Sequence, residues 1–116
     1  MQKYNLSQVN VLIIDSNWNM RRLVGTALEG YGIQNVEFAA DGREGLNKLV
    51  RLPIDLVICE YRLGRINGID LTRKIRRSRK KFDPFVPILL LTADTEEGVV
   101  AAARDAGISG VIAKPV

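Results

Sequence analysis

Five short apolar runs recur along the chain, near residues 11–14, 36–39, 56–59, 86–91 and 111–113. The segments between them carry apolar residues at the three-to-four residue spacing of an amphipathic helix. Continuously apolar strands that alternate with helices are typical of a parallel sheet covered on both faces. Because crossovers between parallel strands are right-handed, the pattern predicts a doubly wound α/β domain of five strands and four helices.

The expected helices lie near residues 20–31, 46–50, 69–75 and 99–106. Gly30 and Gly32 flank the expected end of the first helix, and Asp94 or Thr95 is the expected cap of the fourth. The chain stops at Val116, just after the last apolar run. We therefore expect one domain over residues 1–116 whose last helix is missing or truncated. An apolar stretch of one face is then left bare unless another segment or a neighbouring copy covers it, and a homodimer is one arrangement that would supply this cover.

Four of the apolar runs end in a polar side chain, namely Asp15, Glu60, Thr92 and Lys114. In doubly wound folds, binding sites lie at the carboxyl ends of the strands, near the switch in strand order. The sequence therefore predicts one polar pocket, built from two acids, a hydroxyl and an amine, at one edge of the sheet.

Composition excludes several other kinds of site. Histidine is absent, so histidine metal ligands, histidine acid–base catalysis and Ser–His nucleophiles are all ruled out. The single cysteine, Cys59, cannot form a disulfide within the chain, which fits a reducing cytosol. No apolar run approaches the roughly 18 residues of a membrane span. We expect a cytoplasmic protein that does not engage a membrane.

A basic stretch covers residues 73–81, where seven of nine residues are Lys or Arg. One interpretation is a solvated helix end, where cations also favour the negative end of the helix dipole. The other is a surface for an anionic partner such as nucleic acid. Only Phe82 stands beside these charges, which leaves little for base stacking. We therefore do not expect this domain to bind nucleic acid.

Short motifs, taken in order, resemble the receiver domain of bacterial two-component response regulators. They lie at residues 11–15, 20–22, 40–42, 67–68, 87–93, 106–107 and 114–115. The resemblance implies a flavodoxin-like sheet with strand order 2-1-3-4-5. In such receivers, an aspartate after the third strand accepts a phosphoryl group from a histidine kinase, and two acids after the first strand hold Mg²⁺. The resemblance makes Asp15 the first acid, Thr92 the hydroxyl and Lys114 the cation that contact the phosphoryl group and its metal.

Other positions depart from the receiver pattern. Glu60 stands in place of the acceptor aspartate, and Ser16 in place of the second acid. Val111 replaces the aromatic switch residue of the fifth strand, and Gly64 replaces a common proline. Arg62, two residues after the acceptor position, is expected to place its cation over the pocket mouth.

These departures weaken phosphoryl transfer. Ser16 removes one negative charge from the Mg²⁺ site and leaves Asp15 as a weak ligand. Glu60 is longer than aspartate by one methylene, roughly 1.5 Å of reach, and a misplacement of about 1 Å costs on the order of 100-fold in rate. We predict a non-enzymatic, phosphorylation-independent interaction module without a cofactor, whose partners are a histidine kinase or an output protein.

Two questions stay open at this point. Glu60 either pairs with Lys114 as a purely structural contact or partly imitates the phosphorylated state, with about one negative charge against about 1.5 to 2 for a phosphoryl group. The alternative function is a working, Mg²⁺-dependent phosphoacceptor controlled by a histidine kinase. It would use Glu60, or Asp15 as a substitute.

Overall fold

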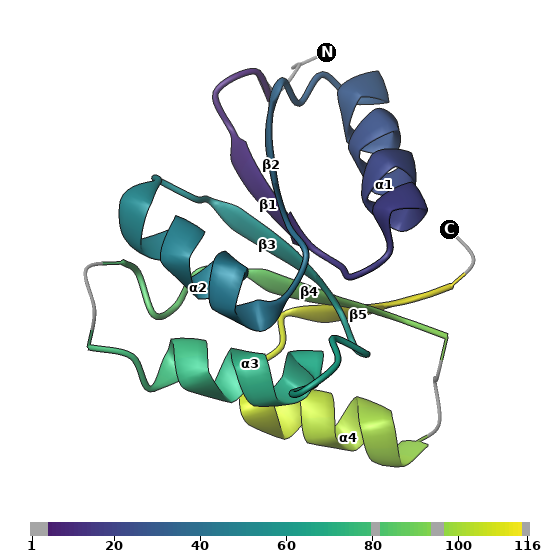
Figure 1. The fold of residues 1–116 in the computed structure, drawn as a ribbon, viewed down its shortest axis with the longest axis vertical. Coiled ribbons are helices and arrows are strands. Elements are labelled where there is room, and N and C mark those ends of the chain that lie inside the picture. The colour runs from purple at the N-terminus through teal and green to yellow at the C-terminus, as the bar shows by residue number, and fades with distance from the viewer. Residues whose placement is uncertain (1–4, 80–81, 94–96, 115–116) are drawn as a thin grey trace.

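The computed structural model describes residues 5–79, 82–93 and 97–114 (Figure 1). Strands and helices alternate from one end to the other, as the sequence predicts. In chain order they are β1 (Asn10–Ile14), α1 (Trp18–Gly30), β2 (Asn35–Ala39), α2 (Gly42–Arg51), β3 (Leu56–Glu60), α3 (Gly68–Arg76), β4 (Ile88–Thr92), α4 (Glu97–Ala106) and β5 (Gly110–Ala113). The expected caps of α4, Asp94 and Thr95, lie outside the described residues.

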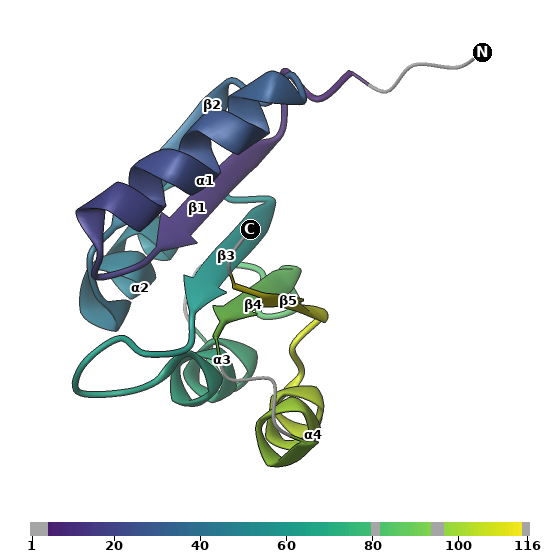
Figure 2. The ribbon, with the colours of Figure 1, turned by 90° about the vertical axis from the view of Figure 1, so that its right-hand side faces the viewer.

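All five strands are parallel and follow the order β2-β1-β3-β4-β5, as expected. Helix α1 lies on one face of the sheet, and α2, α3 and α4 lie on the other (Figure 2). The uneven division of the four described helices is therefore confirmed. None of the described helices has the length and apolar character needed to span a bilayer.

Alternate residues of β1 feed hydrophobic clusters on opposite faces of the sheet. Leu12 and Ile14 of β1 face the helices α2 and α3, where they join one buried cluster with Leu71. Val11 and Ile13 belong to the cluster on the opposite face, beneath Val24 of α1. Side chains of successive strand residues point to opposite faces, so a run that is apolar throughout must be covered on both.

Strand β4 begins two residues later than the apolar run suggests. The run starts at Val86, which is buried, but the strand starts at Ile88. Pro87 has no N–H to give to a neighbouring strand, although its carbonyl accepts a hydrogen bond from the Val57 N–H at 2.9 Å. The proline therefore marks the boundary.

Short polar side chains start three of the helices directly after the strands. The side chains of Asn17, Asp41 and Asn67 each accept a hydrogen bond from a backbone N–H in the first turn of α1, α2 and α3. Each cap satisfies one N–H group that would otherwise lack a partner. The caps turn the chain back over the sheet within a few residues of the carboxyl edge.

Arg76 corrects the interpretation of residues 73–81 as a solvated helix end. Arg76 is the last residue of α3. Its guanidinium donates hydrogen bonds to the carbonyl oxygens of Pro84, Val86 and Gly107, at 2.9, 2.6 and 2.8 Å. Burial lowers the pKa of Arg76, while Asp83 raises it. Arg76 therefore ties α3 to the start of β4 and to the residue after α4, whereas Lys74, Arg77 and Arg79 are exposed.

Candidate functional site

The four predicted pocket residues come from four adjacent strands. Asp15 follows β1, Glu60 ends β3, Thr92 ends β4 and Lys114 follows β5. Asp15, Glu60 and Thr92 are all buried. The parallel sheet therefore brings both acids, the hydroxyl and the amine to one edge, as the sequence predicts.

Lys114 links the two acids. Its ammonium forms an ion pair with Glu60 Oε2, and its Nζ lies 3.8 Å from Asp15 Oδ2. Both of these carboxylate oxygens are shut off from solvent. The Lys114 backbone N–H donates to the Thr92 carbonyl at 2.8 Å, which fixes the end of β5 against β4. The expected pairing of Glu60 with Lys114 is therefore present.

The other two carboxylate oxygens accept backbone hydrogen bonds. The Asn17 N–H donates to Asp15 Oδ1 at 2.8 Å, and the Arg62 N–H donates to Glu60 Oε1 at 3.2 Å. Burial raises the pKa of Asp15, against the lowering influence of the Asn17 N–H and of the Lys114 charge. We call Asp15 and Glu60 the acid pair. Each of their carboxylate oxygens faces either the Lys114 ammonium or a backbone N–H of the same domain.

Among the described residues, Asp15 and Glu60 are the acids of the pocket. Within the residues that the structure describes, no three Asp, Glu, His or Cys side chains are grouped so as to hold a metal ion. Asp15 and Glu60 share the Lys114 ammonium as their cation. Ser16, at the position of the second acid, is exposed.

The remaining predicted residues surround the acid pair in different ways. Arg62 is exposed, and its guanidinium carbon lies 5.7 Å from the centroid of the Tyr61 ring, in a cation–π contact. Gly64 has a φ of 92°, which proline cannot adopt because its ring fixes φ near −65°. Val111 pairs with Leu90 and packs with the cluster beneath α4. The functional roles assigned to Arg62 and Val111 stay predictions.

Gly68 shapes the site, although the sequence marks it only as part of the motif at residues 67–68. Its N–H donates to the Tyr61 carbonyl at 2.7 Å. A Cβ at this position would lie 2.5 Å from the Glu60 carbonyl oxygen and 2.7 Å from Leu90 Cδ1. The first turn of α3 is therefore pressed against the end of β3, which only a glycine permits.

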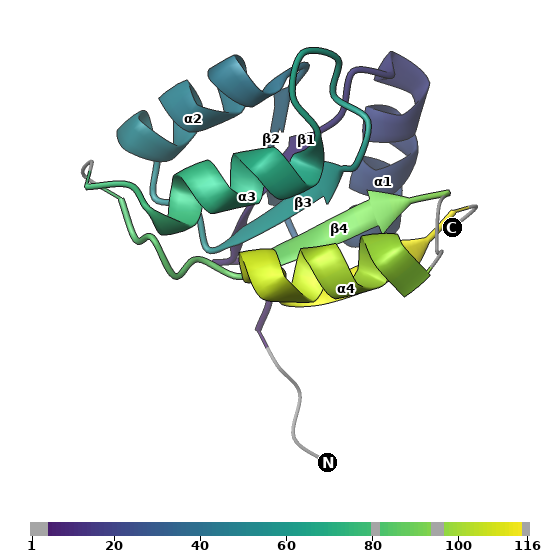
Figure 3. The same ribbon diagram turned by 90° about the horizontal axis from the view of Figure 1, so that it is seen from below.

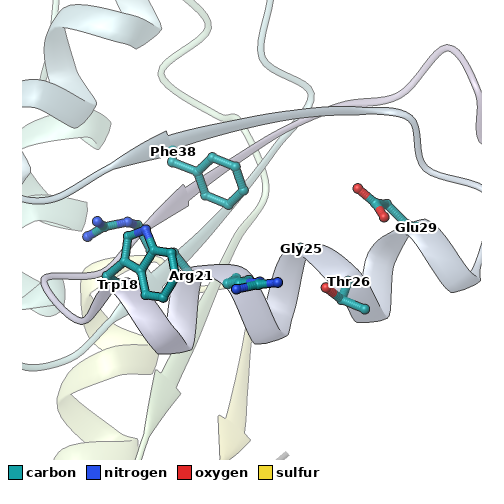
Figure 4. A pocket seen from close by; sticks show the side chains of 7 residues that line it. Trp18, Arg21, Gly25, Thr26, Glu29 and Phe38 are labelled. Atoms are coloured by element: carbon teal, nitrogen blue, oxygen red, sulfur yellow. The ribbon is translucent and has the colours of Figure 1, made fainter.

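A separate hollow of about 420 Å³ lies between α1 and the edge strand β2 (Figure 4). Trp18 and Phe38 border it, and Trp18 is 60% exposed. The Arg22 guanidinium carbon lies 5.5 Å from the centroid of the Trp18 ring. Trp18 is therefore a surface residue of α1, outside the acid pair and outside the core.

Replacing Asp15 by asparagine is expected to stabilise the fold at neutral pH by about 1 kcal/mol. The folded pKa of Asp15 is raised, so its ionised form opposes folding above that pKa. The penalty fades as the pH falls through the folded pKa and vanishes below the unfolded value. Thermal unfolding of both proteins from pH 7 to pH 4 measures the difference, which should shrink toward acid.

Asp105→Asn provides the matched control, because Asp105 is an exposed acid on α4. Its effect on the melting temperature should be small throughout the pH range. An Asp15→Asn variant that is less stable than the parent at pH 7 would mean that the attraction of Lys114 outweighs the cost of burying the carboxylate.

Comparisons with known proteins converge on one family. The model of the response regulator receiver domain matches residues 11–116. The chemotaxis protein CheY-3 of Vibrio cholerae is 32% identical over 107 residues, which are 92% of this chain and 81% of that protein. The chemotaxis protein CheY of Pseudomonas aeruginosa is 29% identical over 107 residues, 92% of this chain and 85% of that protein.

Solved structures give the same result. The chemotaxis response regulator CheY4 of Vibrio cholerae, in a crystal grown at low pH, superposes with a TM-score of 0.84 and 30% identity. The superposition covers 93% of this chain and 88% of that one. A two-component response regulator from Clostridium difficile gives a TM-score of 0.84 at 27% identity, covering 94% and 85% of the two chains.

Proposed function

This chain belongs to the response regulator receiver domain family, and from its site we propose a phosphorylation-independent protein-interaction module of two-component signalling. Receiver domains are signalling modules that act with kinases or output proteins. The finer proposal is that this one is not an enzyme and that it works in the cytoplasm through protein contacts alone.

The state of Glu60 is the observation that carries the proposal. Its side chain is only 8% exposed, with Oε2 against Lys114 and Oε1 accepting the Arg62 N–H. A nucleophile must present a free oxygen in line with the phosphoryl group. Attack by Glu60 would first have to break one of these two contacts, and the longer side chain displaces the oxygen from the usual position.

The metal side of the reaction is weakened as well. Mg²⁺ prefers a near-octahedral set of oxygens that includes carboxylates and waters. The residues present fit this poorly, because Ser16 supplies no charge and the Lys114 ammonium stands against both acids. We propose that Mg²⁺ has no role in this domain.

The Glu60–Lys114 pair supports a domain held in one conformation. It places a carboxylate of the chain itself beside the lysine that contacts the phosphoryl group in receivers. Val111 is smaller than an aromatic residue, so this position of β5 has no aromatic ring that could rotate with the state of the pocket. Imitation of the phosphorylated state, self-association and the lack of nucleic-acid binding remain predictions.

Incubation with acetyl phosphate and Mg²⁺, followed by intact-mass measurement, tests the proposal. The chain as it stands should gain no phosphoryl group. The double variant Glu60→Asp, Ser16→Asp should gain one, only when Mg²⁺ is present, because it restores the short acceptor and the second acid. Each single variant and a sample without Mg²⁺ serve as controls.

Phosphorylation of the unchanged chain would contradict the proposal. It would favour the alternative function, a working Mg²⁺-dependent phosphoacceptor. If the double variant also gains no phosphoryl group, we would infer that the loop after β3 prevents phosphorylation. Gly64, with its positive φ, and Arg62, stacked on Tyr61, would then be the residues that hold the loop away from a receptive geometry.

A further inference from the structure

A hollow of about 670 Å³ lies between α2, α3 and the loop that joins β3 to α3. The two helices run on the same face of the sheet (Figure 1), and the loop arches outward beyond the end of β3 (Figure 3). The hollow is separate from the acid pair, since none of Asp15, Glu60, Thr92 and Lys114 lines it. We call it the α2–α3 groove.

The α2–α3 groove has an apolar floor and a basic rim. Leu46 of α2 and Leu63 and Ile66 of the loop form the floor, as extensions of the core beneath the helices. The rim carries Arg43, Arg65 and Lys74, all exposed. One acid, Asp41, stands among the described lining residues, and its carboxylate accepts a hydrogen bond from the Glu44 N–H at the start of α2.

The three rim cations lack counter-charges within the described part of the chain. The side chains of Arg43, Arg65 and Lys74 form no ion pair or hydrogen bond with any other described residue. Other cations of the same helices do have ion-pair partners. Lys48 of α2 pairs with Glu37 and Glu44, and Arg73 of α3 pairs with Asp70. Like charges gathered around one apolar hollow create a positive potential that an acidic partner would satisfy.

The anatomy of the groove favours a protein segment as the occupant. An apolar centre with a charged, solvent-exposed rim that includes arginine is typical of protein interfaces. Small-molecule sites enclose most of the ligand and fix it with buried polar groups, whereas the charged side chains here are all exposed. Among the described residues that line the groove none is aromatic, so a nucleic-acid base has no ring there to stack on.

We propose that the α2–α3 groove binds an acidic amphipathic helix of a partner protein. Apolar side chains at helical spacing would lie on Leu46, Leu63 and Ile66, and flanking Asp or Glu side chains would reach Arg43, Arg65 and Lys74. This inference rests on the proposed function as an interaction module and names the chemistry of the partner. It also gives Lys74, from the basic stretch, a role that Arg76 does not share.

Peptide selection on the full 116-residue chain tests the proposal. A display library of random peptides of about 16 residues, roughly four helical turns, is selected on the chain. The triple variant Arg43→Glu, Arg65→Glu, Lys74→Glu is used to remove peptides that bind elsewhere. The enriched peptides should combine two or more acids with apolar residues at spacings of three and four.

Affinities of an enriched peptide then locate the site. The triple groove variant should bind at least about 30-fold more weakly than the parent chain. A control triple variant with the same change of charge, Arg22→Glu, Arg51→Glu, Arg79→Glu, should stay within about threefold of the parent. Amide chemical shifts of the parent chain on peptide addition should change mainly at α2, α3 and the connecting loop, which requires no variant.

Four results would overturn the proposal. The enriched peptides could lack acids, or both triple variants could weaken binding equally, which would indicate net charge rather than a groove. The shifts could fall on another surface, or adenosine monophosphate or duplex DNA could bind the groove where acidic peptides do not. The phosphodonor assay is independent of all four, so failure here leaves the proposed function standing.

Discussion

Lys114→Met is expected to destabilise the fold by about 3 kcal/mol, because it leaves two buried carboxylates without their cation. The Lys114 side chain is 19% exposed, and the Asp15 and Glu60 side chains are 3% and 8% exposed. The loss should be largest at neutral pH. The pKa of Asp15, already raised by burial, loses the lowering influence of Lys114 and rises further, so protonation relieves the penalty in acid. Urea unfolding at pH 7 and pH 5 measures both effects.

Lys48→Met is the matched control for this change. Lys48 is 20% exposed and also faces two acids, but Glu37 and Glu44 are 48% and 47% exposed. Its loss should cost about 1 kcal/mol, including the hydrogen bond that its ammonium donates to the Phe38 carbonyl. If the two variants lost the same free energy of unfolding, the burial of Asp15 and Glu60 would not depend on the Lys114 charge.

Gly68→Ala is expected to cost about 3 kcal/mol, since a methyl group has no room between α3 and the end of β3. Its Cβ would lie 2.5 Å from the Glu60 carbonyl oxygen, a backbone atom that cannot turn aside. The helix must therefore move away from the strand, or the end of β3 must shift together with the Glu60 carboxylate. Thermal unfolding gives the stability loss, and chemical shifts of Glu60 and Arg62 report the movement.

Gly98→Ala is the comparison that isolates the contact. Gly98 lies in the first turn of α4, and a Cβ there meets no heavy atom within 4 Å. Alanine should be neutral or stabilise the helix by up to about 1 kcal/mol. If Gly68→Ala matched Gly98→Ala in stability, the close approach of α3 to Glu60 would be refuted.

The acid pair was accessible from the sequence because it depends only on strand order and strand ends. Asp15 and Glu60 each follow an apolar run, and parallel strands bring such ends to the same edge. Lys114 and Thr92 follow the same rule, so their meeting required no knowledge of side-chain conformations. The apolar run near residues 86–91 is longer than strand β4, because Val86 is buried outside the ladder, before Pro87.

The contacts of the arginine side chains were harder to predict from the sequence. Arg76 sits in a basic run, yet its guanidinium is held by carbonyl groups of Pro84, Val86 and Gly107, which only the tertiary fold brings together. Arg62 leans on its neighbour Tyr61, a choice between rotamers that spacing does not encode. Long flexible side chains take their conformation from partners distant in sequence.

Two further features could not be predicted from the sequence. One is the close approach of Gly68 to the Glu60 carbonyl, and the other is the α2–α3 groove. An Asn-Gly pair indicates a turn or a capped helix start, but not that a strand carbonyl lies where a Cβ would be. The groove combines residues from α2, the connecting loop and α3, so its apolar floor and unpaired rim become visible only once those elements are packed.

The ion pairs of Lys114 also bear on biosynthesis. A ribosome delivers Asp15 and Glu60 well before the lysine that neutralises them, because β5 follows the other four described strands in chain order. Until then, a nascent chain that closes its first four strands must bury two carboxylates against each other. We therefore expect the early strands to remain open during translation, and the sheet to close around its acids only when its final strand emerges from the exit tunnel.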